Sequence, residues 1–508
     1  MITKCDVAWL LAVAGAAVLL CLPTARHVAW LGDEGILLHA AQRALSGHAL
    51  YRDTFFFLPP GGVVLLEGWF AVTGVSWLSA RVLAIVSIAA TACLTFLACR
   101  KSSRSAPLSA AIAIAWLVTS QGYWTQVSYH WLCAMFAMAA VWAVLHHEDA
   151  PGNDPRYPLI GGLAIGAAGM ILPTVGALAA LAALSAFVGP QRGRALIAYL
   201  IGCAIVPLLL IAGLAVQGTL VAAFEQAILF PARHYAPIQG VAFGAGAQPQ
   251  DRPMQVLYPL LVFATLYLAA RDRKGVYGDR RFLTCVAFAV AGFIACFPRP
   301  DTIHIAMAAP LACPLLAAVL QRIAARWPRG LRYVAAGLAL GLFVPSVIAF
   351  ADYAKSVRDV ETVATARGPI RLQGQGGLKE ILAGIAATPA TDRYLFYPYM
   401  PLLPFLTARE HVARYDLFVP GYAPGYQYRE ACIAAMRDAA WVVVDRSWTD
   451  PVVLQATFPS MRETAPAEMT AFRTAIESGF DVTVSSGTFE LRQRTSAANE
   501  ALCAGIPD

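Results

Sequence analysis

Charged residues are scarce in this 508-residue chain, and their scarcity excludes an ordinary soluble protein. Only 14% of the residues are charged and 58% are hydrophobic. Soluble domains carry about a quarter charged residues and just under half apolar ones. Several segments run long enough without charge to cross a hydrocarbon core of roughly 30 Å. The composition therefore predicts a polytopic α-helical membrane protein.

Two motifs are also missing. None of the eleven cysteines forms a C-x-x-C pair, so the sequence contains no metal or redox motif of that kind. All but Cys432 and Cys503 are Cys5 or lie in the membrane region, where cysteine is most simply a small packing residue. No A-x-A cleavage site follows the first apolar segment, which begins after Lys4. We interpret that segment as a retained membrane span rather than a secretory signal.

Positive charge is in modest excess, +7 over the chain, but it is not gathered in one basic surface. The lysines and arginines lie in short clusters between apolar runs. That distribution is expected of the cytoplasmic loops of a membrane protein. It favours membrane lipids as a partner and argues against nucleic acid.

The basic clusters predict the topology, because basic loops remain on the cytoplasmic side of a membrane. Placing every cluster on that side requires about eleven spans, of which two are short and meet near Pro173. The N-terminus is then cytoplasmic and the C-terminal region lies outside. The spans whose ends the sequence marks best are 7–23, 79–99, 107–122, 129–146, 195–216 and 333–351.

A long outer loop is expected between the first two spans. Only one span fits before the basic cluster at 100–104, yet 59–74 and 79–99 are both apolar. The first is short, rich in glycine and contains Glu67, whereas the second has the length of a span and ends at the cluster. We therefore place 24–78 outside the membrane, as a loop with interfacial helices.

The character of the sequence changes after Phe350. Residues 352–508 are charged and contain no span, and β-type runs such as AAWVVVDRSW alternate with helical ones such as PAEMTAFRTAIESGF. We predict a transmembrane module at 1–351 and a small α/β domain at 352–508. In an external domain Cys432 and Cys503 could pair, and the sequence leaves a disulfide and two thiols equally open. The aromatic stretch YDLFVPGYAPGYQY either packs this domain or binds an acceptor carbohydrate.

Two adjacent carboxylates, Asp33 and Glu34, follow the first span directly. Neighbouring residues cannot point the same way on a helix, so only one of them can face a cavity. Asp33 suits the N-cap of the helix GILLHAAQRAL, where its charge meets the positive end of the helix dipole. It also suits a general base that takes the proton from an acceptor hydroxyl. The residues alone leave both interpretations open.

Basic residues gather in the later outer loops. Arg233 and His234 lie in FEQAILFPARHYAP, and Arg299, Asp301 and His304 lie in FPRPDTIHIAMAAP. Arginine offers a bidentate donor fork, so these loops could hold a phosphate, with Asp301 orienting either cation. Alternatively, their side chains reach to lipid headgroups at the interface.

Three further polar residues of the outer loops could support such a site. Arg52 and Asp53 follow the helix that begins near the carboxylate pair. His130 stands beside Trp131, where a single histidine is more often an interfacial packing residue.

The stretch GDEGILLHAAQRALSGHALYRDTFFFLPPG resembles the first outer loop of certain bacterial GT-C glycosyltransferases. These are the protein-O-mannosyltransferase and aminoarabinose-transferase type, glycosyltransferase family 39 and its relatives. The shared elements are the DE pair, an A-x-R helix, a Y-R-D turn and a proline pair. FPRPDTIHIAMAAP is similar to a late outer loop of that family, and FLTAREHVARYDLFVPGY with AAWVVVD is similar to its C-terminal domain.

The resemblance implies a GT-C fold with an external catalytic cavity, and transfer with inversion from a polyprenyl-phosphate sugar. Asp33 would be the catalytic carboxylate and Glu34 the second acid of the site. Arg299 and His304 match the family's donor-phosphate residues by motif, and Arg233 and His234 match by position. No metal or other cofactor is expected to be required, although relatives with pyrophosphate-linked donors use a divalent ion.

The expected donor carrier is undecaprenyl phosphate, and the acceptor an envelope glycolipid, polysaccharide or protein. The expected location is the bacterial inner membrane, with the C-terminal domain in the periplasm. A saccharide ligase, a polymerase or a transporter is the main alternative, and an inactive structural subunit is another. Transporters tend to carry ionisable groups at mid-membrane, whereas this chain places them at one face.

Overall fold

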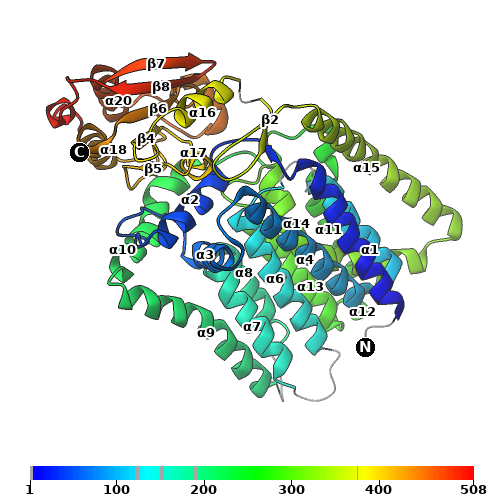
Figure 1. Ribbon diagram of the computed structural model, residues 1–508. Helices are drawn as coiled ribbons and strands as arrows, with labels where there is room; N and C mark the ends of the chain where they lie inside the picture. The colour runs from blue at the N-terminus through cyan, green and yellow to red at the C-terminus, as the bar shows by residue number, and fades with distance from the viewer. Residues whose placement is uncertain (1–3, 121–124, 149–153, 188–191, 375, 508) are drawn as a thin grey trace. The chain divides into compact units, whose positions relative to one another are not determined.

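The structure, a computed structural model, describes residues 4–120, 125–148, 154–187, 192–374 and 376–507 (Figure 1). The chain divides into two compact units. The helical unit comprises Met1–Ala25, Val82–Gly213 and Ala242–Arg358. The mixed unit comprises Arg26–Arg81, Leu214–Val241 and Asp359–Asp508.

The apolar runs of the sequence form the helical unit (Figure 1). Its main helices are α1 (Lys4–Cys21), α4 (Trp77–Ser103), α5 (Ala106–Ser120), α6 (Tyr129–His147), α7 (Arg156–Gly169), α8 (Pro173–Leu184), α9 (Gly193–Val216), α11 (Arg252–Arg271), α13 (Arg280–Ala295), α14 (Thr302–Arg326) and α15 (Arg329–Arg358). Short helices are η1 (Leu22–Thr24), η5 (Pro249–Asp251) and α12 (Arg273–Tyr277). Two of the boundaries between the units fall inside helices, after Arg81 in the second turn of α4 and after Gly213 in the last turn of α9.

The predicted polytopic architecture is confirmed. Every segment expected as a span is helical, except that the end of 107–122 reaches positions outside the described residues. Seven helices of the described chain are long and apolar enough to cross a membrane, namely α1, α4, α6, α9, α11, α14 and α15. The other expected spans are shorter helices. The expected break near Pro173 also occurs, because α8 begins at this proline. Proline is tolerated in the first turn of a helix, where its missing N–H would have had no partner within the helix.

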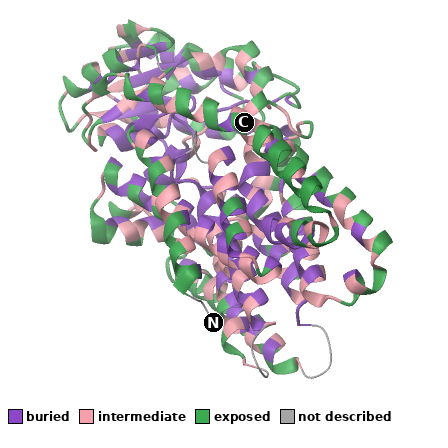
Figure 2. Ribbon diagram, turned by 90° about the vertical axis from the view of Figure 1, so that its right-hand side faces the viewer, coloured by how far each residue is buried: buried purple, intermediate pink, exposed green. Residues whose placement is uncertain are grey.

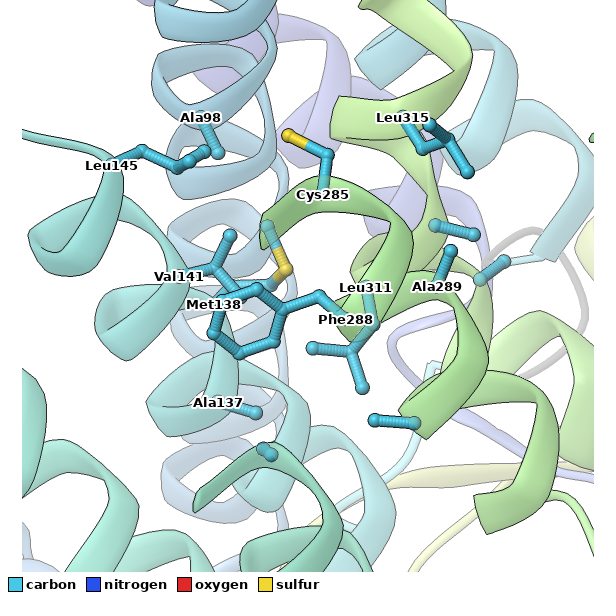
Figure 3. Packing of buried hydrophobic residues seen from close by; sticks show 14 of the residues in the cluster. Ala98, Ala137, Met138, Val141, Leu145, Cys285, Phe288, Ala289, Leu311 and Leu315 are labelled. Atoms are coloured by element: carbon cyan, nitrogen blue, oxygen red, sulfur yellow. The ribbon is translucent and has the colours of Figure 1, made fainter. Parts of the chain in front are cut away.

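Small side chains allow the helices of this unit to pack closely. Figure 3 shows Ala98, Ala137, Met138, Val141 and Leu145 packed with residues of α13 and α14 in one buried cluster. At the crossing of α7 and α9, Gly162 and Gly202 bring the two backbones so close that a Cβ on either would clash. Membrane helices lack a hydrophobic drive toward one another and depend on such close packing.

Burial separates the inside of the bundle from its lipid-facing surface. Buried residues gather in the interior, and exposed ones lie along the outer helices (Figure 2). On α9 and α15 many of the exposed residues are apolar, including Leu208, Leu209, Leu338 and Leu340. A soluble protein would not expose so many, whereas a lipid-facing helix does.

The mixed unit contains two sheets. The small one has the order β1-β3-β2, formed by β1 (His27–Val28), β3 (Ile370–Leu372) and β2 (Thr362–Val363). The larger one has the order β5-β4-β6-β8-β7, formed by β5 (Glu410–His411), β4 (Arg393–Tyr397), β6 (Trp441–Asp445), β8 (Phe489–Arg494) and β7 (Phe480–Ser486). Strands β5, β4 and β6 are parallel, whereas β8 and β7 are antiparallel to their neighbours.

Helices of the mixed unit come from all three of its segments. The first outer loop forms α2 (Asp33–Leu45) and α3 (Gly61–Thr73). The middle segment forms α10 (Leu220–Phe224), two π-helical turns, η2 (Glu225–Leu229) and η3 (Pro231–Tyr235), and η4 (Ala236–Ile238). The C-terminal segment forms α16 (Leu378–Ala386), α17 (Leu402–Thr407), α18 (Gly425–Asp438), η6 (Arg446–Thr449), α19 (Pro451–Thr457), α20 (Ala467–Gly479) and η7 (Glu500–Cys503).

A disulfide and an aromatic core stabilise the C-terminal segment. Cys432 on α18 and Cys503 on η7 form a disulfide with a Cα–Cα distance of 5.8 Å, so the pairing that the sequence left open is confirmed. Tyr415, Phe418 and Tyr428 are buried in the same core as α18 and α20. Of the two interpretations of the aromatic stretch, the packing one therefore fits the structure.

The C-terminal α/β region is confirmed, but the division at residue 351 stays a prediction. Helix α15 continues to Arg358. The mixed unit also includes Arg26–Arg81 and Leu214–Val241. The first outer loop thus folds with the C-terminal segment rather than with the helices that flank it in sequence.

Candidate functional site

The acidic pair stands in the first turn of α2. The N-cap of this helix is Gly32, so Asp33 is the first helical residue rather than the cap that the sequence suggested. Its side chain is partly exposed, and its Oδ1 accepts a hydrogen bond of 2.6 Å from the Tyr399 hydroxyl. A carboxylate at this position still benefits from the positive end of the helix dipole.

Glu34 has a different environment from its neighbour. It is 2% exposed and forms an ion pair with Arg81, which is equally buried. The Arg81 guanidinium also lies 3.9 Å from the centroid of the Trp77 ring and donates 3.0 Å to the carbonyl oxygen of His27. Burial and the charge of Arg81 lower the pKa of His27 to about 4, so this histidine is neutral. The two carboxylates diverge as expected, and Asp33 is the more accessible one.

Two glycines bring the start of α2 against the segment that follows β4. A Cβ at Gly35 would clash with the backbone of Pro401 and Leu402, and the Leu402 N–H donates 3.0 Å to the carbonyl oxygen of Leu31. A Cβ at Gly32 would meet the Tyr399 ring at 2.6 Å. Only glycine permits these approaches, so Tyr399 is held beside Asp33 by backbone packing.

Three aromatic rings contact each other next to Asp33. Trp30 lies 5.7 Å from Tyr399 and 5.3 Å from Trp448 between ring centroids, and Tyr399 lies 5.3 Å from Trp448. All three contacts are edge-to-face, the arrangement that aromatic quadrupoles favour. This trio limits how far Tyr399 can move from the carboxylate.

The second half of α2 is anchored by a buried polar group. His39 Nδ1 lies 2.9 Å from Asp416 Oδ1, and His411 Nε2 lies 3.8 Å from the same oxygen. Burial lowers the pKa of His411 to about 4, although the Asp416 charge opposes the shift. Burial alone would raise the pKa of Asp416, but His39, His411 and Arg43 together outweigh burial and the pKa is lowered.

Arg43 completes this anchor with four hydrogen bonds. It donates to Thr54 Oγ1 at 2.8 Å, and to the carbonyl oxygens of Asp53 at 2.7 Å, His411 at 3.1 Å and Ala413 at 3.2 Å. The guanidinium therefore joins the first outer loop to the strand β5 region. These four hydrogen bonds give Arg43 a structural role and occupy the donors that it would need to bind a ligand.

Arg52 and Asp53 occupy a turn where Tyr51 has a φ of 70°. They form a bidentate pair, with Arg52 Nε and Nη2 each 3.1 Å from an Asp53 carboxylate oxygen. Asp53 Oδ2 also accepts 2.8 Å from the Ala49 N–H. The hydrogen bond from Arg52 lowers the pKa of Asp53 despite partial burial. Their role as supporting site residues stays a prediction.

Arg233 and His234 lie on the π-helical turn η3 of the mixed unit. Arg233 is exposed, and the ring of His234 lies 4.8 Å from that of Phe230. Burial and the neighbouring Arg233 lower the pKa of His234. The segment is fixed to the first outer loop by Gln226, which accepts 3.0 Å from the Phe56 N–H and donates 2.6 Å to the Tyr51 carbonyl oxygen.

The helical unit holds the remaining predicted residues as one group. Asp301 is the N-cap of α14 and accepts hydrogen bonds from the His304 N–H at 3.0 Å, His304 Nδ1 at 2.7 Å and Arg299 Nε at 2.8 Å. Burial would raise the pKa of Asp301, but the hydrogen bonds and charge of His304 and the bond from Arg299 lower it to about 2. Asp301 is thus ionised at neutral pH and orients the Arg299 guanidinium and the His304 imidazole.

His130 belongs to the same group. Its ring centroid lies 5.0 Å from that of His304, at an interplanar angle of 88°. Both histidines line a narrow, mostly apolar hollow with a cavity volume of about 30 Å³, together with residues such as Cys133, Met138 and Leu311. The sequence analysis treated His130 as a single interfacial residue. In the structure it contacts His304 and so belongs to the Asp301 group.

The predicted site residues fall into two sets. The mixed unit contains Asp33, Glu34, Arg52, Asp53, Arg233 and His234, and the helical unit contains His130, Arg299, Asp301 and His304. That both sets act on one donor stays a prediction.

Among the residues that the structure describes, no group of three or more His, Cys, Asp or Glu side chains could hold a metal ion. Metal independence itself stays a prediction.

Sequence reasoning did not find the partners of the acidic pair. Arg81 lies 47 residues from Glu34, and Tyr399 lies 366 residues from Asp33. The only sequence signal for Tyr399 was its place near the end of DRYLFYPYM (392–400), one of the β-type runs of the C-terminal region. Arg81 had no signal of its own, since it stood at the start of an expected span.

No protein-family model matches the sequence, and no curated protein matches it. Among solved structures, apo ArnT from Cupriavidus metallidurans matches over 99% of this chain and 100% of that one, with a TM-score of 0.56 and 14% identity. ArnT from the same organism, bound to undecaprenyl phosphate, matches over 97% and 99%, with a TM-score of 0.54 and 13% identity. The arabinofuranosyltransferase AftD from Mycobacteria matches over 97% of this chain but 40% of its own, with a TM-score of 0.53 and 15% identity.

The likeness to ArnT extends over nearly the whole of both chains, and this chain spans less than half of AftD. At such low sequence identity, the structural similarity establishes the fold alone. The resemblance that the first outer loop suggested is confirmed at that level: the chain is a multi-pass membrane protein with the GT-C fold of ArnT.

Proposed function

We propose that the protein is an integral-membrane inverting glycosyltransferase that moves a sugar from a polyprenyl-phosphate donor to an extracytoplasmic acceptor. One observation carries the proposal. In a chain with the fold of ArnT, Asp33 is a partly exposed carboxylate fixed at the start of a rigidly anchored helix. A general base needs this combination of access and fixed orientation.

In the proposed reaction the acceptor hydroxyl attacks the anomeric carbon of the donor sugar. Asp33 takes the hydroxyl proton, a new C–O bond forms, and the bond between the sugar and the phosphate oxygen breaks. The electron pair of that bond leaves with the polyprenyl phosphate. Direct displacement on the opposite face inverts the anomeric carbon. No oxidant or other reactant is needed.

The chain's own residues have distinct tasks in this scheme. Tyr399 donates to Asp33 and holds its carboxylate in a fixed orientation. Glu34 positions the first turn of α2 through Arg81. The leaving phosphate would be stabilised by charge-assisted hydrogen bonds from the guanidinium groups of Arg233 and Arg299, and by N–H donors of His234 and His304.

The ArnT structure with undecaprenyl phosphate supports that lipid as the donor carrier of this protein. We further propose the bacterial inner membrane as its location, with a cytoplasmic N-terminus and a periplasmic C-terminal domain. The disulfide between Cys432 and Cys503 suits such an oxidising compartment. The proposed acceptor is a hydroxyl of an envelope glycolipid, a polysaccharide or a protein.

The test compares envelope glycolipids, polysaccharides and glycoproteins by mass spectrometry in strains that differ only in this gene. A deletion strain is complemented with the wild type, with Asp33→Asn, or with Asp481→Asn, an exposed carboxylate on β7. One sugar increment is expected to disappear on deletion and to return with wild type and Asp481→Asn. With Asp33→Asn it should fall by roughly 10²–10⁴-fold in rate, the usual contribution of a general base.

Immunoblots of membranes must show equal amounts of each protein. If Asp33→Asn at that level restores the full increment, Asp33 is not the base. If the deletion changes neither lipid, polysaccharide nor glycoprotein, the glycosyltransferase proposal fails as a whole.

A further inference from the structure

The C-terminal sheet has a pocket that the proposed transfer reaction does not use. Its cavity volume is about 180 Å³, which is below the ~300–1,000 Å³ of drug-sized sites and suits only a small ligand. Tyr397, Val444 and Ile476 contribute to its lining, together with charged residues from η6, α20 and β8. All of them belong to the mixed unit.

The pocket lies where the topology of the sheet favours a ligand. Tyr397 is the last residue of β4, and Val444 is the penultimate residue of β6, its parallel neighbour. From β4 the chain passes to β5 on one side, and it then returns to β6 on the other. The loops after β4 and β6 therefore part in opposite directions. In open α/β sheets, ligands bind in the crevice outside the carboxyl ends of strands at such a switch point.

The unsatisfied Tyr397 hydroxyl is evidence that the pocket binds a ligand. Its oxygen is buried and has no hydrogen-bond partner among the described residues. Burial raises the pKa of Tyr397, and the charges of Arg473 and Glu477 at the pocket act on the same hydroxyl. A buried hydroxyl without a partner is costly, and native proteins rarely leave one so.

The charges of the pocket leave one positive charge uncompensated. Glu490 is held by Arg492 at 2.7 Å and by Arg446 at 3.3 Å, so this carboxylate is already saturated. Arg473 and Glu477 lie one helical turn apart on α20, 3.7 Å from each other, and both are about half exposed. Three guanidinium groups thus face two carboxylates, and Arg473 is the least committed donor.

We propose that this pocket binds a hydroxylated small monoanion of the sugar-acid type, a carboxylate on a polyhydroxylated ring. The ligand's carboxylate pairs with Arg473 at the pocket mouth, where a guanidinium can bind it through two N–H groups. A ring hydroxyl takes the partnerless Tyr397 hydroxyl as its donor or acceptor. Val444 and Ile476 offer an apolar surface to the C–H face of the ring.

This site is independent of the transfer chemistry. None of its residues belongs to the acidic pair or to the proposed phosphate-binding residues. The ligand it binds could therefore be detected even in a protein whose Asp33 has been replaced.

The test measures binding of D-glucuronate to the full-length protein in lipid nanodiscs, by saturation-transfer NMR and by hydrogen–deuterium exchange. D-glucose serves as the uncharged control and acetate as the carboxylate without hydroxyls. We expect glucuronate to slow exchange at 441–449 and 467–479, and glucose and acetate to leave it unchanged at the same concentration. Equal protection by acetate would overturn the proposal, as would no protection by glucuronate.

Variants connect the binding to the two residues that carry the inference. Arg473→Gln should weaken glucuronate binding by roughly tenfold or more, the loss of a charge-assisted hydrogen bond. Arg437→Gln is the matched control, because Arg437 is an exposed arginine on α18 outside the pocket. Binding that Arg437→Gln and Arg473→Gln reduce equally would contradict the pocket assignment.

Tyr397→Phe separates a ligand role from a structural one. The wild-type hydroxyl has no protein partner to lose, so the variant should unfold at the same temperature as the wild type or at a higher one. It should nevertheless bind glucuronate roughly fivefold more weakly, the effect of one neutral hydrogen bond. A stable Tyr397→Phe protein with unchanged affinity would show that the hydroxyl does not face the ligand.

Discussion

The two acidic centres of this protein both stand at the start of a helix, but they are built differently. Asp301 caps α14 and takes its partners from residues two and three positions away. The pair at the start of α2 takes its partners from Arg81 and Tyr399, which are 47 and 366 residues distant in the chain. A carboxylate with local partners depends on its own loop, whereas one with distant partners depends on the fold of the whole unit.

This difference also separates the two acids of the pair. Glu34 is buried with its cation, and Asp33 is partly exposed beside a hydroxyl. Buried ion pairs tolerate the loss of one partner poorly, because the other charge is left in a medium that cannot solvate it. We therefore expect substitutions at Glu34 to lower the stability of the fold and substitutions at Asp33 to lower the activity.

The largest expected effect on stability is that of Glu34→Gln. Removing the charge leaves Arg81 buried without its counterion, so the free energy of unfolding should fall by about 3–5 kcal/mol. Thermal unfolding of the purified protein in nanodiscs measures this loss. Replacing both partners, as Glu34→Leu with Arg81→Met, should recover most of it, because a well-packed apolar pair replaces a buried ion pair at little cost.

Glu410→Gln is the matched control in the same unit. It breaks the exposed pair between Arg393 and Glu410, which lie 2.6 Å apart, and should cost about 1 kcal/mol or less. Equal losses for Glu34→Gln and Glu410→Gln would contradict the distinction between a buried and an exposed pair.

The next effect concerns the distant link between α18 and η7. Replacing Cys432 and Cys503 together by serine should lower the stability of the mixed unit by about 2–4 kcal/mol, the usual range for a disulfide. Hydrogen exchange should become faster in that unit and stay unchanged in the helical unit. Mass spectrometry after alkylation without reductant checks the bond itself: two alkylatable thiols at these positions would refute the pairing.

A smaller effect is expected from acid at Asp301. Its folded pKa of about 2 lies below its ordinary value, so its ionised form stabilises the fold at pH values above about 4. This contribution, roughly 2 kcal/mol, should disappear as the pH falls toward 2. Asp301→Asn keeps a capping side chain but cannot ionise, so its stability should lack this part of the acid dependence. Identical pH profiles for variant and wild type would show that the local partners do not hold the charge.

The smallest effect is expected from Tyr399→Phe. The variant keeps the aromatic trio and loses only the hydrogen bond to Asp33, so we expect transfer to slow by roughly fivefold. In the proposed transfer Tyr399 orients Asp33 without touching a substrate, so kcat should fall while KM stays the same, and the pH profile of kcat should shift. A change in KM alone would mean that Tyr399 contacts a substrate instead.

The sequence predicted what depends on neighbours in the chain. Apolar runs and basic clusters marked the helices, Pro173 marked a break, and the spacing of Arg299, Asp301 and His304 marked one polar group. The C-terminal α/β region followed from alternating patterns, and the resemblance of the first outer loop indicated the fold of ArnT.

What the sequence could not predict are pairings between distant segments. Nothing near Glu34 indicates that its cation is Arg81, and nothing near His39 indicates Asp416 or His411. Such contacts depend on how segments come together in three dimensions, which periodicity does not encode. The start of α2 was also predicted imprecisely, since the N-cap is Gly32 and not Asp33, the residue that the sequence suggested.

The two π-helical turns at 225–235 have a consequence for evolution and engineering. A π turn holds one residue more than an α turn, and such turns occur frequently at functional sites. Deleting a single residue such as Ala232 would let the segment return to α-helical geometry without removing any charge. The residues beyond the turn would keep their directions, because a π turn accommodates one extra residue without rotating the helix that follows it. Arg233 and His234 lie inside the turn and would face another direction with their chemistry unchanged, so one missing codon would rearrange these two basic residues.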